Sequence, residues 1–370
     1  MSYLRFMRAG LALGLVIWAL SGISFSAEKL MISGEFTPLD HPARHLAFWK
    51  SLKLRSVLEN KIIRAPSVLI DYLCKDNLVQ GFSNIPKPAD LAPDYKADLV
   101  AALKDLPESV KKVVGPNLYG IAVVSDLGGS AYTDTVLSET KEPLGAFMVL
   151  DLSMLNRQAN EWLSWKENSP FLPDSKTQLV AEIETASSDT RKNALQFILL
   201  HEFGHVIAAT VDLHPSWNKT HDSPGKHPFS ALSWKLYEKS AGYVSIFDHH
   251  FGLRRYVTYY RGAETKIEIS HAPQIYGALE KTNFATLYAA TSPADDFAES
   301  FATYVHTVLM KRPYLIKIRS GGHLIKSFSP CWGQKRCETK QKIIERLLGV
   351  SKKSHFAPQC FRNRARCGRQ

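Results

Sequence analysis

Two histidines and a glutamate stand close together near the middle of the chain, in the segment His201-Glu202-Phe203-Gly204-His205. Residues four apart on an α-helix lie one above the other, so both imidazoles can bind one metal ion. Zn²⁺ readily takes imidazole nitrogen and lowers the pKa of bound water to about 7. The Glu202 carboxylate can then take a proton from that water. The alternative is a polar stripe on a surface helix, but the spacing favours a metal site.

The motif falls within the clearest helical pattern of the sequence. Apolar residues repeat at spacings of three and four between Ser187 and Val211, and Ser188 or Asp189 is available as the N-cap. A glycine inside a helix costs roughly 1 kcal/mol relative to alanine. Gly204 therefore suggests that another element approaches this helix closely.

Catalytic zinc usually has three protein ligands, so one more ligand is required. The short-spaced pattern has a glycine three residues after the second histidine and a histidine or aspartate ligand three residues further on. These positions hold Ala208 and Val211, and Asp212 comes one residue late. A ligand nineteen residues after the second histidine would be Pro224, so that spacing fails as well. The third ligand must therefore come from a more distant part of the chain.

A second helical pattern begins at Ser292-Pro293, a cap followed by proline at the first helical position, and runs to about Leu309. Asp295 and Glu299 are four residues apart and share one face of it. Asp295 is a candidate metal ligand, a helix-capping acid, or a carboxylate that supports a ligand. Glu299 is a candidate ligand, a partner that orients His201 or His205, or a solvated acid.

The combined pattern resembles the zinc metallopeptidases of the anthrax lethal factor type. The matching features are the His201–His205 motif, Tyr288 seven residues before Asp295, and Phe-Ala-Glu ending at Glu299, within roughly residues 190–310. The resemblance implies that Asp295 is the third ligand and that Tyr288 stabilises the tetrahedral intermediate. The family has Glu where this chain has Asp295, one methylene shorter, so Asp295 and Glu299 both stay candidate ligands. Tyr288 could instead be a packed aromatic residue.

The same resemblance implies an α+β fold with a zincin-like metallopeptidase core. Such a core has an active-site helix, a small mixed sheet and a helical C-terminal part, and its edge strand binds extended peptide. Gly145–Leu152 is our candidate for that strand.

Periodicity predicts several other elements. Two short helices between 95 and 115 are separated at Pro107, strands are expected at Tyr119–Ser125 and Gly145–Leu152, and a helix is expected over 153–168. Residues 212–290 look like a long irregular insertion with some helix. We expect an N-terminal region at 27–94, a metallopeptidase domain at 95–320 and a basic tail containing cysteines at 321–370.

Composition is typical of a globular protein: of 370 residues, 45% are hydrophobic and 22% are charged, with a net charge of +11. Arg5 and Arg8 precede the apolar run Ala9–Leu20, and small residues follow. This order predicts a signal peptide at residues 1–26, cleaved near Ser26, and hence export to the periplasm or medium. An uncleaved anchor needs about 20 apolar residues, more than this run offers.

Five cysteines fit an oxidising compartment, because disulfides persist there. Four lie near the C-terminus, and two local loops are the simplest pairing, although four cysteines allow three connectivities; the five are Cys74, Cys331, Cys337, Cys360 and Cys367. The basic tail has no recognisable nucleic-acid motif, so we expect no nucleic-acid partner; it fits an anionic envelope surface.

We therefore expect an exported zinc-dependent peptidase that acts on protein or peptide. The main alternative is a zinc-bearing binding or structural protein of the cell envelope that does not cleave peptides, and a weaker one is hydrolysis of a non-peptide amide in the cell wall. The remaining histidines are expected to be surface or core residues; those considered are His214, His221, His227, His249, His250, His271, His306 and His323.

Overall fold

The computed structural model describes residues 37–153, 156–216, 222–237, 242–260 and 265–350. The predicted signal peptide, Cys360, Cys367 and His221 lie outside these ranges. No helix within them is long and apolar enough to cross a membrane. The described helices are α3 (Leu46–Ser51), α4 (Ser67–Val79), α5 (Pro93–Lys104), α6 (Glu108–Val114), α7 (Ala159–Asn168), α8 (Arg191–Ala208), α9 (Ala272–Leu279), α10 (Pro293–Tyr304) and α11 (Glu338–Leu348).

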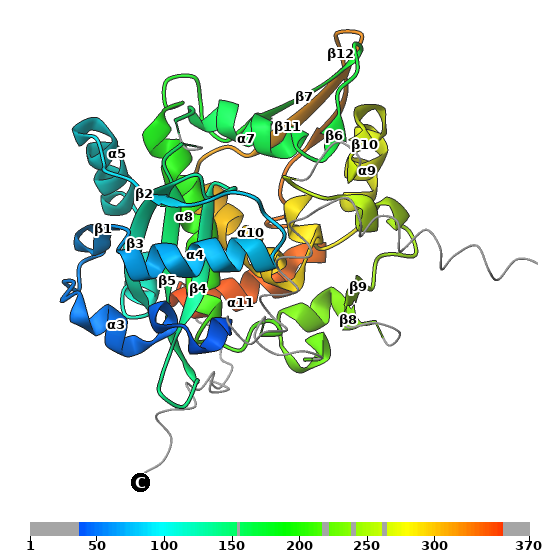
Figure 1. Cartoon of the computed structure of the whole chain (residues 1–370). Coiled ribbons are helices and arrows are strands. Elements are labelled where there is room, and N and C mark those ends of the chain that lie inside the picture. Colours follow the sequence, from blue (N-terminus) through cyan, green and yellow to red (C-terminus); the bar gives the residue numbers. More distant parts are fainter. Residues whose placement is uncertain (1–36, 154–155, 217–221, 238–241, 261–264, 351–370) are drawn as a thin grey trace, which may run out of the picture.

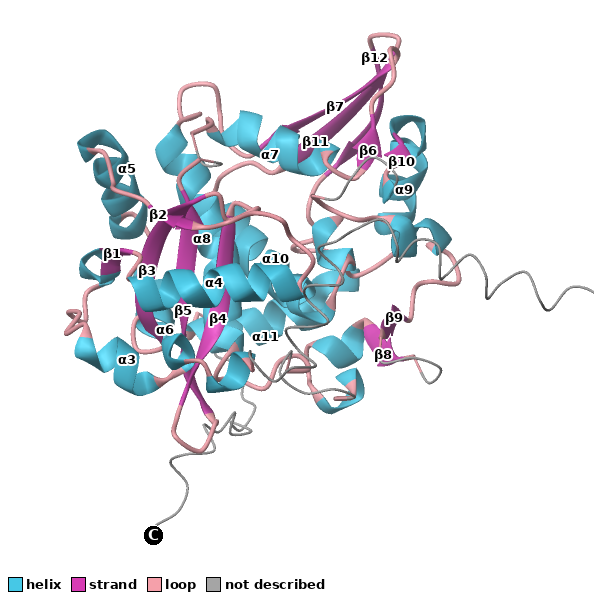
Figure 2. Cartoon of the chain, viewed as in Figure 1, coloured by secondary structure: helices cyan, strands magenta, loops and turns pink. Residues whose placement is uncertain are grey.

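Helices and several sheets together make a mixed α+β fold (Figure 2). The strands are β1 (Ile62–Arg64), β2 (Lys87–Pro88), β3 (Leu118–Ser125), β4 (Ala131–Leu137), β5 (Pro143–Asp151), β6 (Phe171–Leu172), β7 (Thr177–Glu182), β8 (Trp234–Leu236), β9 (Tyr243–Ser245), β10 (Ile267–Glu268), β11 (Leu315–Ser320) and β12 (His323–Phe328). The predicted helices around Pro107 and the strands at 119–125 and 145–152 are confirmed as α5, α6, β3 and β5.

The main sheet has the strand order β1-β3-β5-β4, and β2 also pairs with β3. β1, β3 and β5 are parallel, whereas β4 runs antiparallel to β5. β1 and β2 come from the region before residue 95, so this sheet draws strands from both sides of that expected boundary. β7, β11 and β12 form a separate antiparallel sheet that projects from the molecule (Figure 1).

Alternating side chains of the main sheet fill two different cores, one on each face. Ile121 and Met148 point into a large core that includes residues of α5, α6 and α8. Ala122 and Phe147 point into a smaller core with α3 and α4. Because both faces are covered, β3 and β5 are long apolar runs. Figure 1 shows α4 crossing one face of the sheet while α8 lies behind the other.

This topology corrects one expectation from the sequence. The candidate edge strand, Gly145–Leu152, corresponds to β5, which lies between β3 and β4 and is therefore an interior strand. The edge strand next to α8 is instead β4, which packs against that helix. The predicted 153–168 helix also starts later, at Ala159.

Candidate metal centre

Helix α8 carries both motif histidines and runs along the main sheet. Its N-cap is Thr190, whose side chain accepts a hydrogen bond from the backbone N–H of Asn193, rather than Ser188 or Asp189. The Asp189 carboxylate instead accepts from the backbone N–H of Asn160 at 2.9 Å, at the start of α7. Thirteen residues of α8 are buried, so packing holds this helix firmly against the sheet.

Helix α10 brings the two candidate acids to α8. It starts where the sequence predicts, with Ser292 as N-cap and Pro293 at the first position, and a π-helical turn at Val305–Leu309 extends it. The two helices touch at Gly204, where a Cβ would lie 2.5 Å from Cα of Ala298. The expected close approach at this glycine is thereby confirmed.

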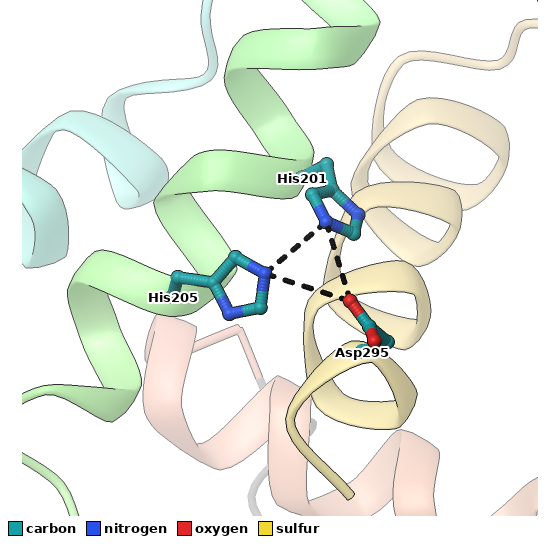
Figure 3. A group of neighbouring side chains, drawn as sticks. All are labelled: His201, His205 and Asp295. Atoms are coloured by element: carbon teal, nitrogen blue, oxygen red, sulfur yellow. Dashed lines mark hydrogen bonds and ion pairs between the residues drawn. The ribbon is translucent and has the colours of Figure 1, made fainter. Parts of the chain in front are cut away.

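His201, His205 and Asp295 come together at this crossing (Figure 3). The two Nε2 atoms are 3.2 Å apart, and Oδ1 of Asp295 lies 3.9 Å from each. These side chains remain 12%, 13% and 21% exposed, so solvent reaches the cluster. One group of atoms able to hold a metal ion is thus assembled from two helices.

The two carboxylate oxygens of Asp295 have different surroundings. Oδ2 accepts hydrogen bonds from Ser292 Oγ at 2.7 Å and from Thr291 Oγ1 at 3.2 Å, while the backbone N–H of Asp295 donates to Ser292 Oγ at 3.0 Å. Oδ1 faces the histidines. Helix capping and metal ligation, posed as alternatives by the sequence, are therefore compatible here.

Glu299 contacts the opposite side of His201. Its Oε1 lies 2.9 Å from Nδ1 of His201 and accepts from Lys166 Nζ at 2.7 Å, while Oε2 accepts from Thr286 Oγ1 at 2.7 Å. Burial alone would raise the pKa of Glu299, but Lys166 and His201 outweigh burial and hold it below its usual value. A carboxylate can only accept, so Nδ1 of His201 donates and Nε2 keeps its lone pair for a metal.

Glu202 lies beside the cluster and is 6% exposed. Its Oε2 accepts a hydrogen bond from Thr133 Oγ1, on β4, at 2.5 Å. Burial raises the pKa of Glu202 above its usual value, and His201 and Thr133 oppose that rise. A raised carboxyl pKa suits a group that must take up a proton and release it again.

Tyr288 packs against the cluster. Its ring centroid is 5.6 Å from that of His201, and Lys166 Nζ lies 4.5 Å from the Tyr288 ring centre. Burial and the charge of Asp295 raise the pKa of Tyr288 well above its usual value, so the phenol stays protonated and can donate. Packing and hydrogen-bond donation can therefore coexist at this residue.

A cavity of about 560 Å³ opens at His201 and Glu202. Its walls come from the start of β4, from α7 and from the segment 255–260, and several are aromatic: Trp162, Tyr259, Tyr260 and Tyr288. This volume is within the range of small-ligand and substrate sites. The donor cluster therefore borders a space in which a substrate can lie.

The other described histidines lie outside the donor cluster. His306 is buried and its Nε2 contacts the carbonyl oxygens of Ile183 and Pro313 at 2.8 and 3.0 Å. His227 lies between Asp212 and Asp222. Their surroundings are those of core and surface residues, as expected.

Sequence reasoning missed three residues that support the site: Thr133, Lys166 and Thr286. The β-branched run at 131–137 after Gly128-Gly129 is a strand signal that could have located Thr133. No comparable signal marks Lys166 or Thr286, because their partner Glu299 is distant in sequence.

Comparison of the chain with protein-family models, with curated proteins and with solved structures finds no match.

Proposed function

We propose that the protein is an exported zinc-dependent peptidase with a zincin-like core. The observation that carries this proposal is the cluster of His201, His205 and Asp295 with Glu202 beside it, at the border of a cavity. The motif's resemblance to metallopeptidases of the lethal factor type points the same way. Export rests on the N-terminal sequence pattern alone.

The donor atoms suit zinc. Ligand atoms about 2.0–2.1 Å from a tetrahedral ion are roughly 3.3 Å apart. The separations here are 3.2, 3.9 and 3.9 Å, so small side-chain movements would bring all three atoms to bonding distance. Two imidazole nitrogens and one carboxylate oxygen are also a ligand set used by catalytic zinc.

The chain's own residues then divide the work of hydrolysis. Zinc bound here would polarise the scissile carbonyl and make water more acidic. Glu202 takes a proton from the attacking water and passes it to the leaving amine. Tyr288, kept protonated, donates a hydrogen bond to the developing oxyanion. Glu299 and Lys166 keep the ring of His201 in its orientation.

The alternative is a zinc protein that does not cleave peptides. Structural zinc sites usually take four protein ligands, whereas the described residues bring three donors together. A buried carboxylate next to those donors, facing a cavity, is also unnecessary in a purely structural site. Both observations favour catalysis.

The test is Glu202→Gln in the purified zinc-loaded protein, assayed by digestion of a peptide library. Loss of the carboxylate should abolish cleavage while zinc stays near one ion per chain, because Glu202 is not a donor in the cluster. Full activity of this variant would refute the mechanism. A wild-type protein that binds zinc but cleaves no peptide would favour the non-catalytic alternative.

A further inference from the structure

We infer that Thr133 is a positioning residue, which holds the Glu202 carboxylate while its own backbone pairs with the substrate. This inference rests on the proposed peptidase function. It identifies both the part of β4 that a peptide can use and the group that aims the general base.

The hydrogen bonding of β4 shows which residues face its free edge. The backbone N–H of Asp151 donates to the carbonyl of Ser130, so even-numbered residues of β4 point their backbone groups toward β5. In an antiparallel pair the intervening residues point theirs away. Ala131, Thr133 and Thr135 therefore present N–H and C=O groups outward.

At Thr135, the backbone groups on the free edge of β4 already have hydrogen-bond partners. Arg44 Nε donates to the carbonyl of Thr135 at 3.2 Å, and the Thr135 N–H donates to the Asp134 carboxylate at 2.6 Å. Among the described residues, the outward groups of Ala131 and Thr133 have no such partners. An extended peptide can therefore add to the sheet at these two residues, which adjoin the cavity and Glu202.

The side chain of Thr133 points out of the plane of the sheet, to the face that α8 covers. Its hydroxyl donates to Oε2 of Glu202 at 2.5 Å, and no other hydrogen bond to this carboxylate is found among the described residues. The bond occupies one oxygen and leaves Oε1 for water. Since one residue binds both peptide and base, the scissile bond and Glu202 take a fixed register relative to each other.

The discriminating variants are Thr133→Val and Thr133→Ser, assayed as zinc-loaded proteins on a peptide that the wild type cleaves. Valine keeps the shape and the backbone but removes the hydroxyl. We expect kcat to fall about 10- to 100-fold, as for a misplaced catalytic group, with KM nearly unchanged and zinc still bound. Serine should restore kcat to within about threefold, because it keeps the donor.

A third variant controls for a packing defect. Thr133→Ala should lose kcat as Thr133→Val does, although its shape differs. If valine matches wild type, or if serine is as impaired as valine, the hydroxyl does not position Glu202 and the inference is wrong. In that case Glu202→Gln would still be inactive, so the proposed function would survive. A wild type that cleaves no peptide would overturn both.

Discussion

At the scale of single residues, the site depends on how each carboxylate uses its two oxygens. In Asp295, Oδ2 accepts a hydrogen bond from Ser292 while Oδ1 faces the histidines. In Glu299, both oxygens already have partners, which are Lys166, Thr286 and His201. Asp295, the shorter side chain, therefore supplies a donor atom to the cluster, and Glu299, the longer one, contacts His201 through Nδ1.

This division predicts different consequences for zinc binding. Asp295→Ala removes a donor and should leave the site nearly empty. Glu299→Gln keeps the shape and should weaken affinity by roughly 10- to 100-fold, as loss of a supporting partner does. Zinc affinity measured by competition with a chromophoric chelator checks both. Full affinity in both variants would mean that α10 does not supply the ligand.

The motif spacing identified His201, Glu202 and His205, since helical geometry alone puts both imidazoles on one face. Sequence also narrowed the third donor to Asp295 or Glu299, but it could not choose between them. The choice depends on where Lys166 and Thr286 lie, and those contacts join distant segments. The strand signal at 131–137 could have located Thr133, but no sequence signal links it to Glu202, 69 residues away.

At the scale of elements, α8 and α10 were predictable from the spacing of their apolar residues. The N-cap of α10 was also predicted correctly, whereas that of α8 is Thr190 rather than Ser188 or Asp189. The edge strand was not predicted correctly. β5 is buried on both faces, and its continuous apolar run is the clearer strand signal. β4 is more polar, so its sequence gives a weaker signal. A continuous apolar run indicates an interior strand, so assigning it to the peptide-binding edge was wrong.

Helix α4 is joined to β4 by a buried polar contact that should make stability depend on pH. Tyr132 OH donates to Asp76 at 3.1 Å, and Asp134 and Arg44 lie nearby. Burial and the charge of Asp134 raise the pKa of Asp76 to about 6, despite opposing contributions from Tyr132 and Arg44. The native state thus holds a proton that the unfolded state releases, and stability falls as pH rises from about 4 to about 6.

Asp76→Asn should remove this loss of stability with rising pH. The variant should match wild type near about pH 4 and exceed it by up to about 3 kcal/mol near about pH 7.5, since each pKa unit corresponds to about 1.4 kcal/mol. Denaturant unfolding of both metal-free proteins at the two pH values tests this. Asp90→Asn, at a side chain that is 82% exposed, is the control. A stability difference that does not vary with pH would contradict the assignment.

At the scale of the whole molecule, α8 and α10, which are far apart in sequence, must stay aligned for the donor cluster to form. α8 is fixed to the sheet, while α10 is held from behind by α11, whose Lys340 forms a buried ion pair with Asp296 at 2.6 Å. The Cys331–Cys337 disulfide, one of the two local loops expected from the sequence, precedes α11 directly. Cys74 forms no disulfide among the described residues.

Zinc should therefore stabilise the fold as a whole, because it would join α8 to α10 in the native state alone. A ligand present at 1,000 times its Kd contributes about 4 kcal/mol to the free energy of unfolding. Removing zinc with a chelator should lower Tm by several degrees, and adding zinc back should restore it. His205→Ala, which removes one donor from the cluster, should unfold at a temperature that does not respond to zinc. If wild type and His205→Ala respond alike, the ion binds elsewhere and the two helices are held together without it, by packing at Gly204 and Ala298 and by the contact between Glu299 and His201.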